Sequence, residues 1–115
     1  MIQVLHNPRC GKSRTCLTFL NESQKKYEII NYLDSPLTVQ ELKELLKKLQ
    51  LKPLDIIRQK ESIWITNYKG KSLSEDALLD ALVAHPILIE RPIVLYNGRA
   101  IIGRDIEKLK EFILS

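Results

Sequence analysis

The sequence predicts an α/β fold in which a mixed sheet of about four strands is flanked by helices. Residues 2–33 have the pattern strand, helix, strand, which makes the first two strands parallel. Residues 92–103 contain two apolar runs joined by Asn97-Gly98, the dipeptide that best fits a two-residue type I′ hairpin turn. Since 115 residues with 44% hydrophobic side chains suffice for one core, residues 1–115 are expected to form a single domain.

The first strand, the first helix and the second strand follow from local pattern. The apolar residues 2–5 run into Asn7-Pro8, which indicates a buried strand stopped by a turn. From residue 13 the apolar side chains, Cys16 among them, recur on one helical face. Residues 27–33 alternate in polarity and predict the second strand.

Helices fill the middle of the chain. The Thr-x-x-Glu spacing at residues 38–41 is that of a capping box, and leucines follow at helical intervals. Residues 53–58, which open with proline, indicate a short helical segment. The pattern of residues 59–71 is ambiguous. Ser72 repeats the capping-box spacing before a helix that ends near His85.

Asp105 is expected to cap a last helix with one apolar side. The complete order is strand, helix, strand, several helices, two strands and a helix. This order, with a cysteine directly after the first strand, suggests a thioredoxin-like fold.

Composition excludes several classes of function. The net charge of +4 is spread over candidate helices instead of clustered with aromatic residues, so no nucleic-acid partner is expected. Because no apolar run approaches the roughly 20 residues that span a bilayer, no membrane association is expected. The first residues lack the apolar core of a secretory signal, which predicts a cytoplasmic protein with reduced cysteines.

The segment HNPRCGKSR, residues 6–14, places Cys10 where the first helix should begin. Free N–H groups and the positive end of the helix dipole favour an anion there. Arg9, Lys12, Arg14 and a protonated His6 would add positive potential. Each of these effects lowers the pKa of a thiol, so Cys10 is predicted to be a nucleophile.

Three known loops do not fit this segment. A Walker A loop needs glycine where His6 stands, and a dithiol redox motif needs cysteine where Ser13 stands. A tyrosine-phosphatase-like loop needs arginine at the position of Cys16. Cys16 is expected in the core, and six helical residues separate it from Cys10 by roughly 9 Å, too far for a disulfide. Electrons must therefore come from outside the chain, and two cysteines are too few for a structural zinc site.

The segment also resembles the N-terminal motif of the glutaredoxin-coupled arsenate reductases, a family that includes the Spx regulators. The resemblance continues through four further motifs, which are YL at residues 32–33, IIRQKE at 56–61, LLDALVAHPILIERPIVL at 78–95 and IIGR at 101–104. It implies a thioredoxin-like fold with a helical insert.

By this resemblance, Cys10 attacks arsenate, which is held by Arg58, Arg91 and Arg104. Guanidinium groups suit a tetrahedral oxyanion because they donate paired, charge-assisted hydrogen bonds. The resemblance also implies that Ser13 and Arg14 organise the thiolate loop. It further implies a cis peptide bond between Arg91 and Pro92. His6, four residues before Cys10, is expected to orient or support the thiolate.

The predicted function is therefore arsenate reduction in arsenic detoxification, with glutathione as co-substrate, glutaredoxin as partner and no bound cofactor or metal. Two alternatives stay open. One is a glutathione-linked thiol oxidoreductase with another substrate, and the other is a Spx-like regulator that binds RNA polymerase.

Overall fold

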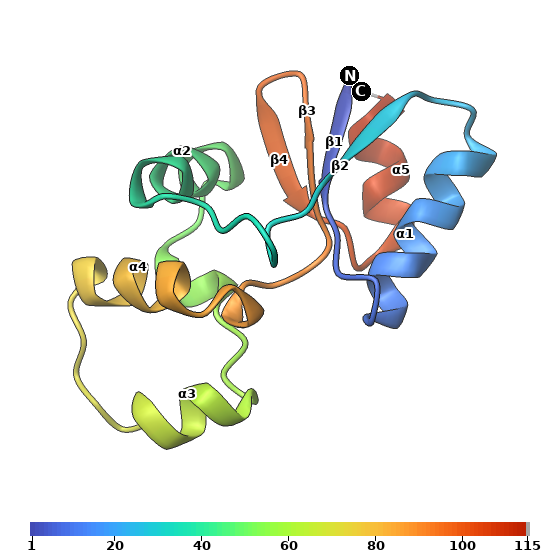
Figure 1. Cartoon of the computed structure of the whole chain (residues 1–115). Coiled ribbons are helices and arrows are strands. Elements are labelled where there is room, and N and C mark those ends of the chain that lie inside the picture. Colours follow the sequence, from blue (N-terminus) through green and yellow to red (C-terminus); the bar gives the residue numbers. More distant parts are fainter. Residues whose placement is uncertain (115) are drawn as a thin grey trace. The chain divides into compact units, whose positions relative to one another are not determined.

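The computed structural model describes residues 1–114 and divides the chain into two compact units (Figure 1). The first unit contains Met1–Tyr32 and Arg91–Ser115, and the second contains Leu33–Glu90, inserted between them in sequence. The second unit is the helical insert. That the two units together make one domain stays a prediction.

The first unit contains the predicted mixed sheet. Its strands are β1 (Ile2–Leu5), β2 (Tyr27–Ile30), β3 (Ile93–Tyr96) and β4 (Arg99–Ile102). They are arranged in the order β2-β1-β3-β4. β1 is parallel to β2 and antiparallel to β3, and β3 is antiparallel to β4. The fold class predicted from the sequence, a mixed four-stranded sheet flanked by helices, is confirmed.

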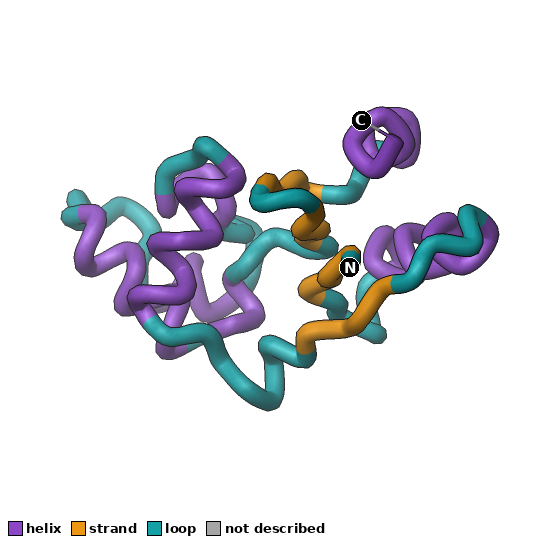
Figure 2. Tube along the Cα trace, turned by 90° about the horizontal axis from the view of Figure 1, so that it is seen from above, coloured by secondary structure: helices purple, strands orange, loops and turns teal. Residues whose placement is uncertain are grey.

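Two helices cover one face of this sheet. α1 (Gly11–Glu22) and α5 (Ile106–Leu114) lie on the same side of the strands in both views (Figures 1 and 2). Their apolar faces form one cluster with alternate residues of β1 and β3. Its buried members are Ile2, Val4, Cys16, Leu20, Val94, Leu109, Phe112 and Ile113. Cys16 is fully buried, so the sequence prediction that it belongs to the core is confirmed.

The hairpin between β3 and β4 has the predicted turn. Asn97 and Gly98 both have positive φ angles, 53° and 74°, as a type I′ turn requires. β2 ends earlier than expected, at Ile30 instead of residue 33. Ile30 pairs with Leu5, the last residue of β1, so the strand has no partner beyond that point.

The second unit is built from helices. They are α2 (Val39–Leu49), the 3₁₀ helix η1 (Pro53–Ile56), α3 (Ser62–Asn67), α4 (Glu75–Ala84) and the 3₁₀ helix η2 (Pro86–Leu88). Thr38 forms the predicted capping box, accepting from the Glu41 N–H at 3.1 Å while Glu41 accepts from the Thr38 N–H at 3.0 Å. The short segment at residue 53 ends at Ile56 instead of Arg58, because Ile57 leaves the helix to pair with Ile89.

The start of α4 differs from the sequence prediction. Ser72 has the spacing of a capping box, but the N-cap residue is Ser74, whose hydroxyl accepts from the Ala77 N–H at 3.1 Å. The capping-box spacing fits Ser72 with Glu75 but not Ser74, whose third following residue is Ala77, so the backbone course and not the spacing places the N-cap at Ser74.

This difference gives a stability prediction. Ser74→Ala is expected to lower the free energy of unfolding by about 1 kcal/mol, since it removes the acceptor for an otherwise unpaired helical N–H. Ser72→Ala is the matched control and should change it by less than about 0.5 kcal/mol. Urea denaturation followed by Trp64 fluorescence measures both, and an equal loss in the two variants would contradict the assignment.

Within residues 1–114, no helix combines the length and the apolar character that a bilayer crossing needs.

Candidate active site

The loop that carries Cys10 is organised by Asn7. The Asn7 carbonyl accepts from the Cys10 N–H at 3.0 Å, and the Asn7 side chain accepts from the Arg9 N–H at 2.9 Å. The Asn7 N–H donates to the Ser13 hydroxyl oxygen at 3.2 Å. Asn7 is 2% exposed and Ser13 is fully buried. These bonds tie the end of β1 to the first turn of α1.

Cys10 is the N-cap residue of α1, with extended backbone angles of φ −98° and ψ 123°. Partial burial raises its pKa, but the backbone N–H groups of Ser13 and Lys12 and the Arg91 side chain lower it more strongly, from 9.0 to about 7. The thiol makes no side-chain cap hydrogen bond, so these groups act on the thiolate, in which sulfur is the better acceptor. The predicted depression of this pKa is confirmed.

The source of the positive charge differs from the prediction. From the sequence, this charge is expected from the neighbouring side chains of Arg9, Lys12 and Arg14. In the structure Lys12 acts through its backbone N–H, and the cationic side chain that stabilises the thiolate is Arg91, 81 positions along the chain. The Arg14 guanidinium instead donates to the Pro8 carbonyl at 3.2 Å and stabilises the loop that precedes Cys10.

His6 lies at the end of β1 and is 9% exposed. Burial and the charge of Arg14 lower its pKa below 6.5, so the imidazole is neutral at pH 7. The expectation that a protonated His6 adds positive potential is therefore wrong. The Nδ1 atom is buried and has no hydrogen-bond partner among residues 1–114. A role of His6 in orienting the thiolate stays a prediction.

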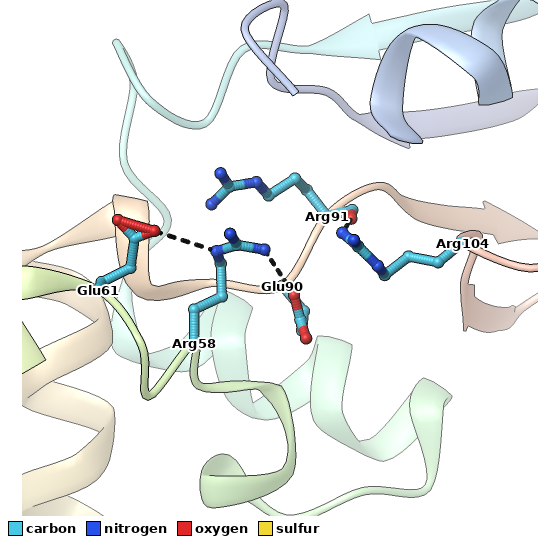
Figure 3. A network of polar contacts seen from close by, with 5 residues as sticks. All are labelled: Arg58, Glu61, Glu90, Arg91 and Arg104. Atoms are coloured by element: carbon cyan, nitrogen blue, oxygen red, sulfur yellow. Dashed lines mark hydrogen bonds and ion pairs between the residues drawn. The ribbon is translucent and has the colours of Figure 1, made fainter. Parts of the chain in front are cut away.

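Arg91 and Arg104 meet in the first unit. Arg104 donates from Nη1 to the Arg91 carbonyl at 3.0 Å, and Arg91 is 7% exposed (Figure 3). The Arg91-Pro92 peptide bond is cis, as the resemblance implies. Gly103 lets the segment before Arg104 pack closely on the sheet, because a Cβ atom there would lie only 3.2 Å from Val94 Cγ2.

A shallow groove of about 580 Å³ opens beside Cys10. It runs along the first two turns of α1 and is also lined by Arg104. The lining residues are Cys10, Gly11, Lys12, Arg14, Thr15, Thr18 and Arg104. They include three cations and no carboxylate, so the groove favours anions. In residues 1–114 no three His, Cys, Asp or Glu side chains gather as a metal site.

Arg58, the third arginine of the predicted oxyanion site, belongs to the second unit. There it forms two ion pairs, with Glu61 at 3.3 Å and with Glu90 at 3.1 Å (Figure 3). The burial of Arg58 lowers the pKa of its guanidinium, but the two carboxylates have the larger effect and raise this pKa. The guanidinium therefore stays fully charged.

Sequence reasoning missed three residues of these arrangements. The sequence indicates Asn7 as part of a turn, and the signal for its further role is that an Asx residue before proline commonly bonds to nearby backbone groups. Glu61 and Glu90 lie inside the motifs that contain Arg58 and Arg91, but their charge alone gave no signal. Glu90 forms its ion pair with Arg58, which lies 32 positions away in the sequence.

The two thiols give a prediction about reactivity. At pH 7 about half of Cys10 is thiolate, whereas burial raises the pKa of Cys16 to about 11. Iodoacetamide is therefore expected to modify only Cys10 in the folded protein, with a rate that rises with pH through a midpoint near 7. Mass spectrometry of peptides from timed samples measures this. Equal labelling of the two thiols would contradict the assignment.

Comparisons with known proteins place the chain among relatives of similar sequence and fold. The model of the ArsC family matches residues 5–112. The uncharacterized protein YfgD of Escherichia coli K12 is 42% identical over 114 residues, 97% of this chain and 96% of that protein. The arsenate reductase of Neisseria meningitidis Z2491 is 41% identical over 111 residues, 95% of each chain. The solved arsenate reductase from Vibrio cholerae superposes with a TM-score of 0.90 at 41% identity, covering 96% of this chain and 95% of the other.

Proposed function

Because the chain belongs to the ArsC family of thioredoxin-like proteins, we propose that it reduces arsenate to arsenite with Cys10 as the nucleophile. The observation that carries the proposal is the position of Cys10 at the N-terminus of α1 with a pKa of about 7. A thiolate that is half formed at neutral pH combines availability with nucleophilicity.

In the proposed reaction the Cys10 thiolate forms a bond to arsenic and an oxygen leaves as water. The thiol of glutathione then bonds to Cys10 Sγ. The electron pair of the broken sulfur–arsenic bond stays on arsenic, which leaves as arsenite in the trivalent state. Glutaredoxin attacks the glutathione sulfur of the mixed disulfide and releases the Cys10 thiolate. Each cycle consumes two electrons, all supplied by thiols from outside the chain.

Arg58, Arg91 and Arg104 are proposed to bind the arsenate oxygens, with Arg14 at the edge of the same site. Guanidinium groups stay protonated and can stabilise the charge that develops on the oxyanion during attack. Arg91 has a second task, since it also stabilises the thiolate. Ser13 supports Cys10 through its backbone N–H, and its hydroxyl holds the loop through Asn7. The proposed location is the cytoplasm, where glutathione and glutaredoxin are reduced.

A coupled assay tests this function. Purified protein is mixed with arsenate, glutathione, glutaredoxin, glutathione reductase and NADPH, and the oxidation of NADPH is followed at 340 nm. Oxidation should require arsenate, and omission of either glutathione or glutaredoxin should abolish steady-state turnover. A rate equal to that of the mixture without protein would overturn the proposal.

A second candidate function is the reduction of another glutathione-linked substrate. It is favoured by the same Cys10 environment, because a low-pKa thiol followed by Ser13 suits monothiol exchange. Activity on a glutathione mixed disulfide without arsenate turnover would select this function. Co-purification with RNA polymerase in place of either activity would select a Spx-like regulator.

A further inference from the structure

We propose that Glu61 and Glu90 are positioning residues for Arg58 and set the net charge that an oxyanion meets there. Their two carboxylates hold the guanidinium in one orientation and offset its charge, which weakens oxyanion binding. This inference rests on the proposed function, in which Arg58 binds arsenate.

The backbone of the second unit places Arg58 beside Glu90. Residues Ile57 and Ile89 form an antiparallel bridge. The Arg58 N–H donates to the Leu88 carbonyl at 2.7 Å, and the Glu90 N–H donates to the Ile56 carbonyl at 2.8 Å. These backbone bonds fix two segments that are far apart in the sequence side by side. The side chains of Arg58 and Glu90 therefore meet without the entropic cost of ordering a free loop.

Glu61 is fixed by α3. It is the N-cap residue of this helix, and its carbonyl accepts from the N–H groups of Trp64 and Ile65 at 3.0 and 3.1 Å. Its own N–H donates to the Arg58 carbonyl at 3.1 Å. The Glu61 carboxylate makes no side-chain cap bond to α3, so it is available to the Arg58 guanidinium.

The two carboxylates approach the guanidinium from opposite sides (Figure 3). Glu61 Oε2 accepts from Arg58 Nε at 3.3 Å, and Glu90 Oε1 accepts from Nη1 at 3.1 Å (Figure 3). A guanidinium has five N–H donors, so three of them, including both on Nη2, have no partner among residues 1–114. The arrangement therefore orients Arg58 and keeps donors for a tetrahedral anion.

The charges of this group oppose an anion. One guanidinium with two carboxylates carries a net charge of −1, in contrast to the cationic groove beside Cys10. The side chains of Arg58, Glu61 and Glu90 are 25%, 27% and 28% exposed, so solvent screens their charges only in part. Removing one carboxylate charge should strengthen the binding of any oxyanion to Arg58.

Charge and hydrogen bonding can be separated by two substitutions. Glu90→Gln removes the charge and keeps an oxygen that can accept from Nη1, whereas Glu90→Ala removes both. Glu90→Gln is expected to lower the KM for arsenate, and the inhibition constant of phosphate, by about two- to five-fold with little change in kcat. Glu90→Ala is expected to lower kcat by at least about three-fold, because Arg58 loses its fixed orientation.

Two further variants make the test specific. Glu61→Gln repeats the charge removal on the other carboxylate and should lower KM in the same direction. Glu44→Gln is the matched control, since Glu44 is exposed on α2 of the same unit. This substitution removes the same charge at a position that does not pair with Arg58. All variants are measured in the coupled assay at two salt concentrations, and Trp64 fluorescence confirms that the second unit is folded.

The outcomes distinguish the two proposals. If wild type reduces arsenate and neither Glu90→Gln nor Glu61→Gln lowers KM, the inference is wrong and the proposed function stands. It is also wrong if Glu44→Gln lowers KM by the same factor, because the effect is then one of net charge. If wild type does not reduce arsenate, the proposed function fails and the inference fails with it.

Discussion

Cys10→Ser is expected to abolish arsenate reduction, with a fall in kcat of at least about 10³-fold. A serine hydroxyl is almost fully protonated at neutral pH, whereas about half of Cys10 is thiolate at pH 7. Serine also cannot form the disulfide through which electrons from glutathione reach arsenic. The coupled assay measures the loss, and circular dichroism confirms that the variant is folded.

Cys16→Ala is the matched control for this substitution. Cys16 is fully buried and its pKa of about 11 leaves it a thiol at neutral pH. The alanine variant is therefore expected to keep kcat within about two-fold, while the small cavity costs about 1 kcal/mol of stability. A large loss of turnover in Cys16→Ala, or residual turnover in Cys10→Ser, would show that Cys10 is not the essential thiol.

Most of the fold could be predicted because its signals are local. The apolar residues of β1, the capping box at Thr38 and the Asn97-Gly98 turn each determine a structure within a few residues. Prediction failed where distant contacts decide. β2 stops at Ile30 because β1 supplies no further partner, and η1 stops at Ile56 because Ile57 pairs with Ile89.

The same contrast applies to the candidate site. The low pKa of Cys10 could be predicted because the helix N-terminus is adjacent to it in sequence. The cation that stabilises the thiolate could not be predicted, because Arg91 lies 81 residues after Cys10 in the sequence. The pairing of β1 with β3 brings it near Cys10. A cation that is adjacent in the sequence contributes little when its side chain is exposed, as that of Arg9 is, because water screens its charge.

The neutral state of His6 has the same physical origin. In the sequence His6 lies near cations, which lower the pKa of an imidazole, and near the predicted thiolate, which raises it. Its burial at the end of β1 and the positive charge of Arg14 both penalise the imidazolium, and both lower the pKa. Burial was not apparent from the sequence, because His6 follows the apolar run of β1 and precedes the polar Asn7-Pro8 turn.

Arg91→Gln is expected to raise the pKa of Cys10 above 7 and to lower arsenate turnover by about 10²- to 10³-fold. Two effects combine in this loss. The thiolate loses a side chain that bonds to it, and the proposed oxyanion site loses a guanidinium. If the pKa of Cys10 rises by about one unit, the thiolate fraction at pH 7 falls from about one half to about one tenth, and alkylation slows about five-fold.

Arg9→Gln separates this explanation from a general effect of charge. It removes the same charge next to Cys10 in the sequence, from an exposed side chain that does not contribute to the pKa of Cys10. The rate of iodoacetamide modification is measured from pH 5 to 9 for both variants and for wild type. The midpoint should rise in Arg91→Gln and stay near 7 in Arg9→Gln. Equal shifts would mean that net charge alone governs the thiol, and a shift only in Arg9→Gln would reverse the assignment of the two arginines.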